Sequence, residues 1–227
     1  MPHTWQKALD KYEYPVRLAK FKDRQMYPGW FKCDTGNGDR ARTIEFEERF
    51  RRLAPDHLEV WYEVVFWKMH SQGRRDYVTR NAIANINDSE PTAKRLYELC
   101  LRYMAHQDRR TFRDFQKNLF PSDAVPVAAT FPAFLCPDDF PMVDNQVASW
   151  VKAKGHHHIY RNSSGMVQWP PITGVNSVSG FVLPWYEWCR CTARILSQRT
   201  ERHWRARDVE MAVFTAQRDG LSLNPLR

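Results

Sequence analysis

The sequence predicts a mostly α-helical fold. Two observations support this class: apolar residues recur with helical spacing from Thr43 onward, and neither a strand-like alternation nor an internal repeat is present. The 227 residues suffice for one large domain or for two small lobes that share a cleft. We expect a single helical domain over residues 44–227, preceded by a separate N-terminal segment.

Residues 1–43 predict an extended, partly looped segment. Aromatic residues alternate there with basic ones, and the turn sequence Gly36-Asn37-Gly38-Asp39 follows. Such a segment either lies over a cleft or straps the outside of the fold. We favour the strap.

Two helices are predicted next. Thr43 is a candidate N-cap, and the acids of "EFEERFRRLA" precede its arginines, as the helix dipole prefers. Pro55 suits the first turn of a second helix that ends at Gly73. Its apolar face is broad and comprises Leu58, Trp61, Tyr62, Val65 and Met69. We therefore expect this second helix to be central and largely buried.

The middle of the chain continues with helical spacing. Leu96, Leu99, Cys100 and Tyr103 form the inner stripe of a helix with a charged outer face. A short apolar helix, "VAATFPAFL", follows the prolines at 121 and 126. After a turn from Pro137 to Pro141, another helix is predicted to begin at Asp144 and to end at Gly155.

The last third of the chain contains an insertion and a helical pair. Residues 156–182 are rich in Gly, Ser and Pro and predict a long irregular loop. From residue 183 onward we expect two helices, with a break near Thr200 to Trp204.

The net charge favours a polyanionic partner. Lys and Arg number 34 against 26 Asp and Glu, which gives +8 and a pI of about 9.4. Arginine suits bidentate phosphate contacts, although charge of this size also serves solubility. No apolar run of about 18 residues and no secretory signal are present, so we expect a cytoplasmic protein without a membrane span. Five cysteines without metal-site spacing predict reduced, mostly buried thiols.

Asp144 stands out from the other acidic residues. The stretch "FLCPDDFPMVDNQVASWV" places the apolar residues 140–143 directly before this acid, at a predicted helix start. A carboxylate there either caps the helix or serves as a fixed negative charge in a site that excludes water.

The order of these segments resembles the helix-hairpin-helix DNA glycosylase superfamily. The matching features are a helix ending in Gln72, the short helix "VAATFPAFL", a proline-rich turn, and "PMVDNQV", which is similar to the family's "PVDTHV". The resemblance implies a two-lobed helical bundle. The sequence departs from the family at the hairpin, where "PSDAVPVAAT" has neither the family's usual glycines nor the lysine that its bifunctional members use for lyase activity. A degenerate hairpin and a monofunctional enzyme are therefore expected. Whether amides near Ala124 to Ala128 still face phosphate is left open by the sequence.

The resemblance implies that a damaged or modified base is flipped between two lobes and that Asp144 promotes hydrolysis of its N-glycosidic bond. The candidate base pocket consists of Trp30, Trp67, His70, Gln72 and Asp208. Three of them each have an alternative role that remains open. Trp67 can pack in the core, Gln72 can be a solvated amide at a helix end, and Asp208 can form a surface salt bridge.

Basic residues on both sides of Asp144 are candidate contacts to double-stranded DNA. They are Arg109, Arg110, Arg113, Lys117, Lys152, Lys154 and Arg161. The triplet His156 to His158 fits a phosphate-contacting loop better than a metal site, because adjacent side chains diverge. No metal or cofactor is expected, and the protein is expected to be monomeric.

Two functions remain at this point. One is a DNA glycosylase acting in base excision repair, or in antiviral defence if its substrate is a hypermodified phage base. The other is a catalytically inactive DNA-binding or interaction module on the same scaffold.

Overall fold

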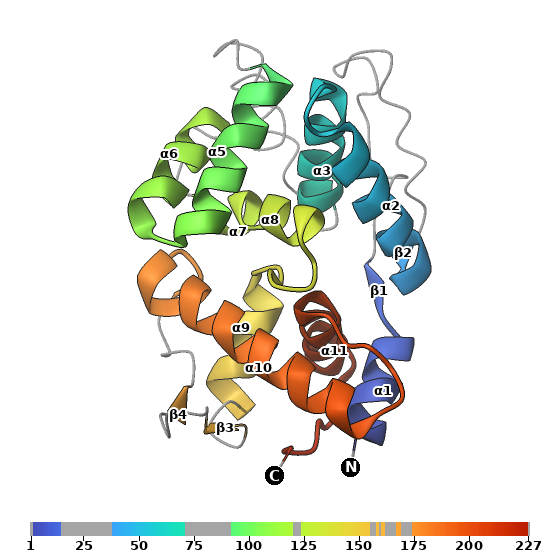
Figure 1. The fold of residues 1–227 in the computed structure, drawn as a ribbon. Coiled ribbons are helices and arrows are strands. Elements are labelled where there is room, and N and C mark those ends of the chain that lie inside the picture. The colour runs from blue at the N-terminus through green and yellow to red at the C-terminus, as the bar shows by residue number, and fades with distance from the viewer. Residues whose placement is uncertain are drawn as a thin grey trace. The chain divides into compact units, whose positions relative to one another are not determined.

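The computed structural model describes residues 2–14, 38–70, 92–119, 124–154, 158, 160–161, 167–168 and 174–226. These residues are mostly helical, as the sequence predicts (Figure 1). They form two compact units. Unit 1 comprises Met1–Tyr12 and Cys136–Arg227, and unit 2 comprises Glu13–Leu135.

Unit 1 is built around a buried C-terminal helix. Its elements are α1 (His3–Asp10), α9 (Asn145–Lys154), the short hairpin of β3 (Tyr160–Arg161) and β4 (Val167–Gln168), a π-helical turn at Val178–Val182, α10 (Leu183–Arg199) and α11 (Ala206–Asp219). Helix α11 packs against α1, α9 and α10. Every residue from Ala206 to Ala216 is buried, so α11 is the core helix of this unit.

Helix α1 corrects the expectation of an extended N-terminal segment. Trp5, Ala8 and Leu9 are buried on one side of α1, which packs against α11. Their spacing of three and four residues is helical, and burying this face stabilises a helix that is too short to form alone. Within the described part of residues 1–43, strands are present only at β1 (Glu13–Tyr14) and β2 (Gly38–Asp39), which pair antiparallel. Residues 15–37, including Trp30, lie outside the described residues.

Unit 2 contains the helices α2 (Arg40–Leu53), α3 (Leu58–His70), α5 (Ala93–His106), α6 (Arg109–Leu119), α7 (Val125–Ala128) and α8 (Thr130–Leu135). Helix α2 begins before Thr43, because Asp39 is its N-cap and accepts a hydrogen bond from the Arg42 amide at 2.9 Å. Helix α3 begins at Leu58 rather than at Pro55. The predicted stripe of α5 is confirmed, since Leu96, Leu99, Cys100 and Tyr103 are all buried.

Aromatic side chains fill the core of unit 2. All six residues of α8 are buried, and Phe131 stacks on Trp61 with ring centroids 4.9 Å apart. The Trp61 indole donates to the Ala54 carbonyl at 2.9 Å. Arg49 joins α2 to α3 through two hydrogen bonds to the Glu63 carboxylate, at 2.6 and 2.8 Å. Within the described residues, no helix is long and apolar enough to cross a membrane.

Candidate functional site

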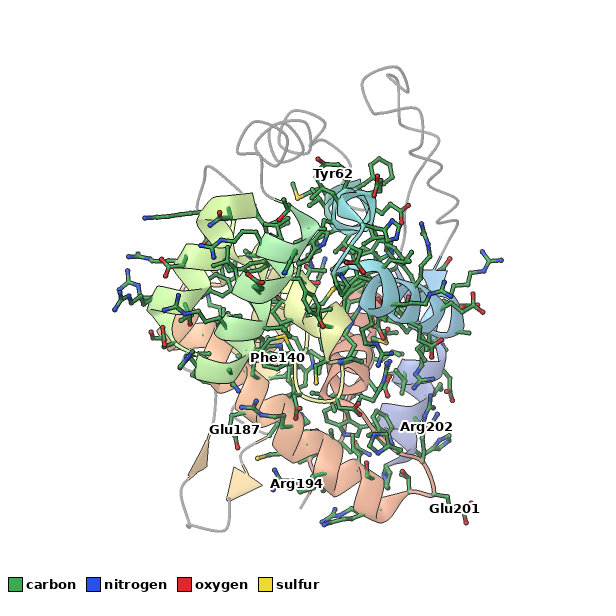
Figure 2. The ribbon with its side chains drawn as sticks, turned by 45° about the horizontal axis from the view of Figure 1, so that its top comes forward. Tyr62, Phe140, Glu187, Arg194, Glu201 and Arg202 are labelled. Carbon is green, nitrogen blue, oxygen red and sulfur yellow. The ribbon has the colours of Figure 1, made fainter. Side chains whose placement is uncertain are left out.

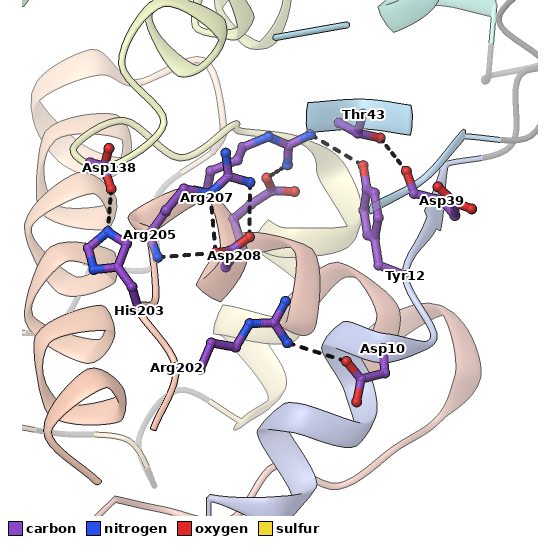
Figure 3. A network of polar contacts seen from close by, with 11 residues as sticks. Asp10, Tyr12, Asp39, Thr43, Asp138, Arg202, His203, Arg205, Arg207 and Asp208 are labelled. Carbon is purple, nitrogen blue, oxygen red and sulfur yellow. Dashed lines mark hydrogen bonds and ion pairs between the residues drawn. The ribbon is translucent and has the colours of Figure 1, made fainter. Parts of the chain in front are cut away.

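The proline turn before Asp144 is bound to the start of α11. The amides of Ala206 and Arg207 donate to the carbonyls of Asp138 and Pro137, at 3.0 and 2.9 Å. First-turn amides have no partner within their own helix, so these bonds satisfy both groups. The Asp138 carboxylate also lies 2.8 Å from the imidazole of His203 (Figure 3). The turn is thus fixed by a segment almost seventy residues away in the sequence.

The apolar residues that follow the turn are buried in unit 1. Phe140 packs edge-on against Tyr186, and Met142 and Val143 are fully buried. The Trp185 indole donates to the Met142 carbonyl at 2.9 Å. The backbone leading to Asp144 is therefore bonded to α10 as well as to α11.

Asp144 begins α9, as predicted. Its side chain is 4% exposed, and Oδ1 accepts the Val147 amide at 2.8 Å. Its carbonyl accepts the Ala148 amide at 3.0 Å. The capping role is confirmed, and the carboxylate is held in a site with little access to water.

Asp208 is the third residue of α11, is fully buried, and forms a capping box with the N-cap residue Arg205. Its carboxylate accepts three hydrogen bonds from Arg205, from the backbone amide and Nε at 3.2 Å and from Nη2 at 3.0 Å (Figure 3). A salt bridge is therefore present, but the expected surface location is wrong. Arg207 instead pairs with Glu210 and donates to the Tyr12 hydroxyl at 3.2 Å.

Trp67 packs in the core of unit 2. It is 2% exposed, stacks on Tyr14 with centroids 4.1 Å apart, and meets the edge of Phe134 at 5.2 Å. The structure therefore agrees with the alternative in which Trp67 packs in the core. His70 is the last residue of α3, and its side chain lies outside the described residues, as does Gln72.

Sequence reasoning missed Lys68, which is 1% exposed. Its ammonium lies 5.8 Å from the Tyr14 ring centroid, and its carbonyl accepts the Tyr14 hydroxyl at 3.3 Å. Glu47 is likewise a fully buried charge in α2. In the sequence, the burial of Lys68 and Glu47 is indicated only by their positions on the inner faces of α3 and α2.

The predicted DNA-contacting residues fall into two groups. Arg109, Arg110, Arg113 and Lys117 are exposed on α6 of unit 2, whereas Lys152 and Lys154 are exposed near the end of α9 of unit 1. Arg161 lies in β3, and its side chain is not among those described.

His158 corrects the expectation of a phosphate contact for its own side chain, whereas residues 156 and 157 lie outside the described residues. His158 is 2% exposed, with its ring 4.9 Å from Trp150 and 5.8 Å from Trp5. Its carbonyl accepts the Trp188 indole N–H at 2.9 Å. Among the residues that the structure describes, no three His, Cys, Asp or Glu side chains are grouped as a metal site.

Two backbone amides of the degenerate hairpin form hydrogen bonds within the hairpin segment itself. Val127 and Ala128 both donate to the Ala124 carbonyl, at 3.0 and 3.2 Å, and Pro126 has no amide hydrogen. Of the two alternatives for this segment, the one in which these amides face phosphate is therefore not supported for residues 126–128.

The four cysteines in the described part are free thiols, as predicted. Burial, with the neighbouring Asp139 carboxylate, raises the pKa of Cys136 to about 11. Burial also raises the pKa of Cys100 and of Cys189. None of these three thiols is activated as a thiolate at neutral pH.

A cavity of 380 Å³ lies at the C-terminal end of α9, lined by Trp150, Lys154, His158 and residues 220–225. Because α9 rises about 1.5 Å per residue, Asp144 lies roughly 15 Å away along the helix axis. This cavity is therefore separate from Asp144.

Comparisons with protein-family models, with curated proteins and with solved structures found no match to this chain.

Proposed function

We propose that the protein is a monofunctional DNA glycosylase that removes a damaged or modified base, with Asp144 as its catalytic carboxylate. The observation that supports this most strongly is the setting of Asp144. It is a nearly buried acid at the start of α9, and the backbone before it is bonded to Trp185 and to the first turn of α11.

This setting suits the chemistry of glycosidic hydrolysis. As the bond breaks, its electron pair leaves with the base and positive charge develops on the sugar ring. A carboxylate fixed beside the anomeric carbon stabilises that charge and orients the attacking water. As the water adds, its proton passes to the carboxylate and from there to the base that left with the electron pair. Because the turn and the cap already hold Asp144, little reorganisation is needed when the charge develops.

A capping bond is compatible with catalysis. An ionised carboxylate has two oxygens and about four lone-pair positions, and the capping bond to the Val147 amide takes one of them. We propose that the same group caps α9 and acts on the sugar.

The second proposal is a non-catalytic DNA-binding module. The bond between Asp144 and Val147 favours it, because a helix cap by itself accounts for an aspartate at this position. The internally bonded amides of Val127 and Ala128 agree with a hairpin that has lost its usual role.

One experiment separates the two proposals. Purified protein is incubated with duplexes that carry oxidised, alkylated or deaminated bases and with phage DNAs that contain hypermodified pyrimidines. Heat and alkali then reveal abasic sites. Product from one substrate, lost in Asp144→Asn while DNA binding is retained, supports the glycosylase. Binding without product across the panel supports the module.

A further inference from the structure

Helix α6 has two chemically distinct faces. Phe112, Phe115 and Leu119 are fully buried on one of them. The exposed side carries four cations, namely Arg109, Arg110, Arg113 and Lys117. In Figure 2, nitrogen-tipped side chains extend outward from the green helices α5 and α6. We refer to these four side chains as the α6 cationic face.

No acidic side chain of the described residues forms a salt bridge with the α6 cationic face. Other arginines of the chain do have such partners, as Arg49 has Glu63 and Arg205 has Asp208. The nearby carboxylate of Asp108 caps α6 by accepting the Thr111 amide at 2.8 Å. The α6 cationic face is therefore a region of concentrated positive charge.

The spacing of the face matches a sugar-phosphate backbone. Arg109, Arg113 and Lys117 are four residues apart, so each step is about 6 Å along the axis and the whole row is about 12 Å long. Phosphates of one DNA strand follow at about 3.4 Å along the duplex axis, so the row spans roughly four of them. Three of the four cations are arginines, which can bind a phosphate through two parallel hydrogen bonds.

We infer that the α6 cationic face binds the backbone of duplex DNA without reading its sequence. A membrane surface fits less well, because the apolar side of α6 is buried and Leu101 is the one large apolar side chain exposed in the described part of the chain. The inference deepens the proposed function, on which it rests for the identity of the polyanion, by assigning a surface that holds the substrate.

The test measures binding to an unmodified duplex of twenty base pairs, so that no base excision enters the result. Affinity is recorded at several salt concentrations for wild type and for the variant Arg109→Gln, Arg110→Gln, Arg113→Gln, Lys117→Gln. Each lost phosphate contact lowers the salt slope by about 0.9, so we expect the slope to fall by about 3 and the affinity at low salt to fall more than tenfold.

A control variant removes the same charge from other helices. Arg51 and Arg52 of α2 and Arg194 and Arg199 of α10 are exposed and have no salt-bridge partner in the described part (Figure 2 labels Arg194). Their replacement by Gln should leave the slope within about one of wild type. Equal losses in both variants would overturn the inference, because net charge alone would then drive binding.

Four further comparisons complete the test. Unfolding midpoints show that each variant is folded, and the double variant Arg113→Glu, Lys117→Glu gives an independent loss of binding. Competition by polyglutamate that exceeds competition by DNA would overturn the inference in favour of an acidic protein partner. Loss of binding by the α6 variant with no abasic product in wild type would keep the inference and reject the glycosylase. Abasic product from wild type, together with unchanged DNA binding by the α6 variant, would support the glycosylase and overturn the inference.

Discussion

At the residue scale, three buried acids in the described part of the chain are paired with arginines. Asp208 lies against Arg205, Glu210 against Arg207, and Glu63 against Arg49. A buried ion pair contributes little net stability, yet removing one partner leaves an uncompensated charge in a poorly solvated place. Single substitutions at these acids should therefore cost far more than substitutions at exposed ones.

Asp208 gives the first prediction. Asp208→Ala removes the cap of α11 and leaves Arg205 without its carboxylate, so the free energy of unfolding should fall by about 3 kcal/mol. Asp219→Ala is the matched control at the other end of α11, where Asp219 pairs with a half-buried Arg218, and it should cost less than about 1 kcal/mol. Urea denaturation measures both. Equal costs would show that Asp208 has no special structural role.

Asp108 gives a prediction about pH. The Thr111 amide holds the pKa of Asp108 below its ordinary value of 3.8. A lowered pKa in the folded state contributes stability above the unfolded value, and that contribution is lost as the pH falls through the folded pKa. Asn keeps the cap but does not titrate. As the pH is lowered from 5 to 2, the unfolding midpoint of wild type should therefore fall relative to that of Asp108→Asn. A constant difference between the two midpoints over this range would contradict the prediction.

At the element scale, α5 ends in a strained residue. Gln107 adopts φ = 48°, and its amide donates to the Tyr103 carbonyl at 2.7 Å. The left-handed conformation costs a residue with Cβ about 1 kcal/mol relative to glycine.

The prediction compares two variants that both lack the Gln107 side chain. Gln107→Gly should be more stable than Gln107→Ala by about 1 kcal/mol in thermal unfolding, because only glycine relieves the strain. Equal stability of the two variants would mean that the turn between α5 and α6 relaxes to another conformation.

The start of α9 gives a prediction about capping. Asn accepts the Val147 amide as well as Asp does, whereas Ala cannot. We expect Asp144→Asn to stay within about 0.5 kcal/mol of wild type and Asp144→Ala to lose about 1 kcal/mol, measured by urea denaturation. If Asn destabilised the protein more than Ala did, the charge of Asp144 itself would be required for folding.

At the scale of the whole molecule, the sequence predicted those features that depend on local patterns. The stripe of α5, the helix start at Asp144 and the break near Thr200 all follow from spacing and cap residues within one or two turns. Helix α1 was missed because its three buried residues lie among basic and aromatic ones, and only packing against the distant α11 selects the helix.

The candidate site was predicted only in part, for the same reason. The position of Asp144 at a helix start is local, but the bonds that hold the preceding turn come from Trp185, Ala206 and Arg207. His158 is buried by Trp5 and Trp150, which no local pattern brings together. Long-range pairs of this kind leave no signal in a single sequence.

In the proposed function, the negative charge of Asp144 acts in catalysis in addition to capping α9. Its test is the single-turnover rate of abasic-site formation by wild type and by Asp144→Asn, on the substrate that wild type cleaves. The rate of Asp144→Asn should be at least a hundredfold lower at an unchanged unfolding midpoint, because the cap is kept while the charge is lost. Equal rates for the two proteins would contradict the proposed function and leave Asp144 as a helix cap.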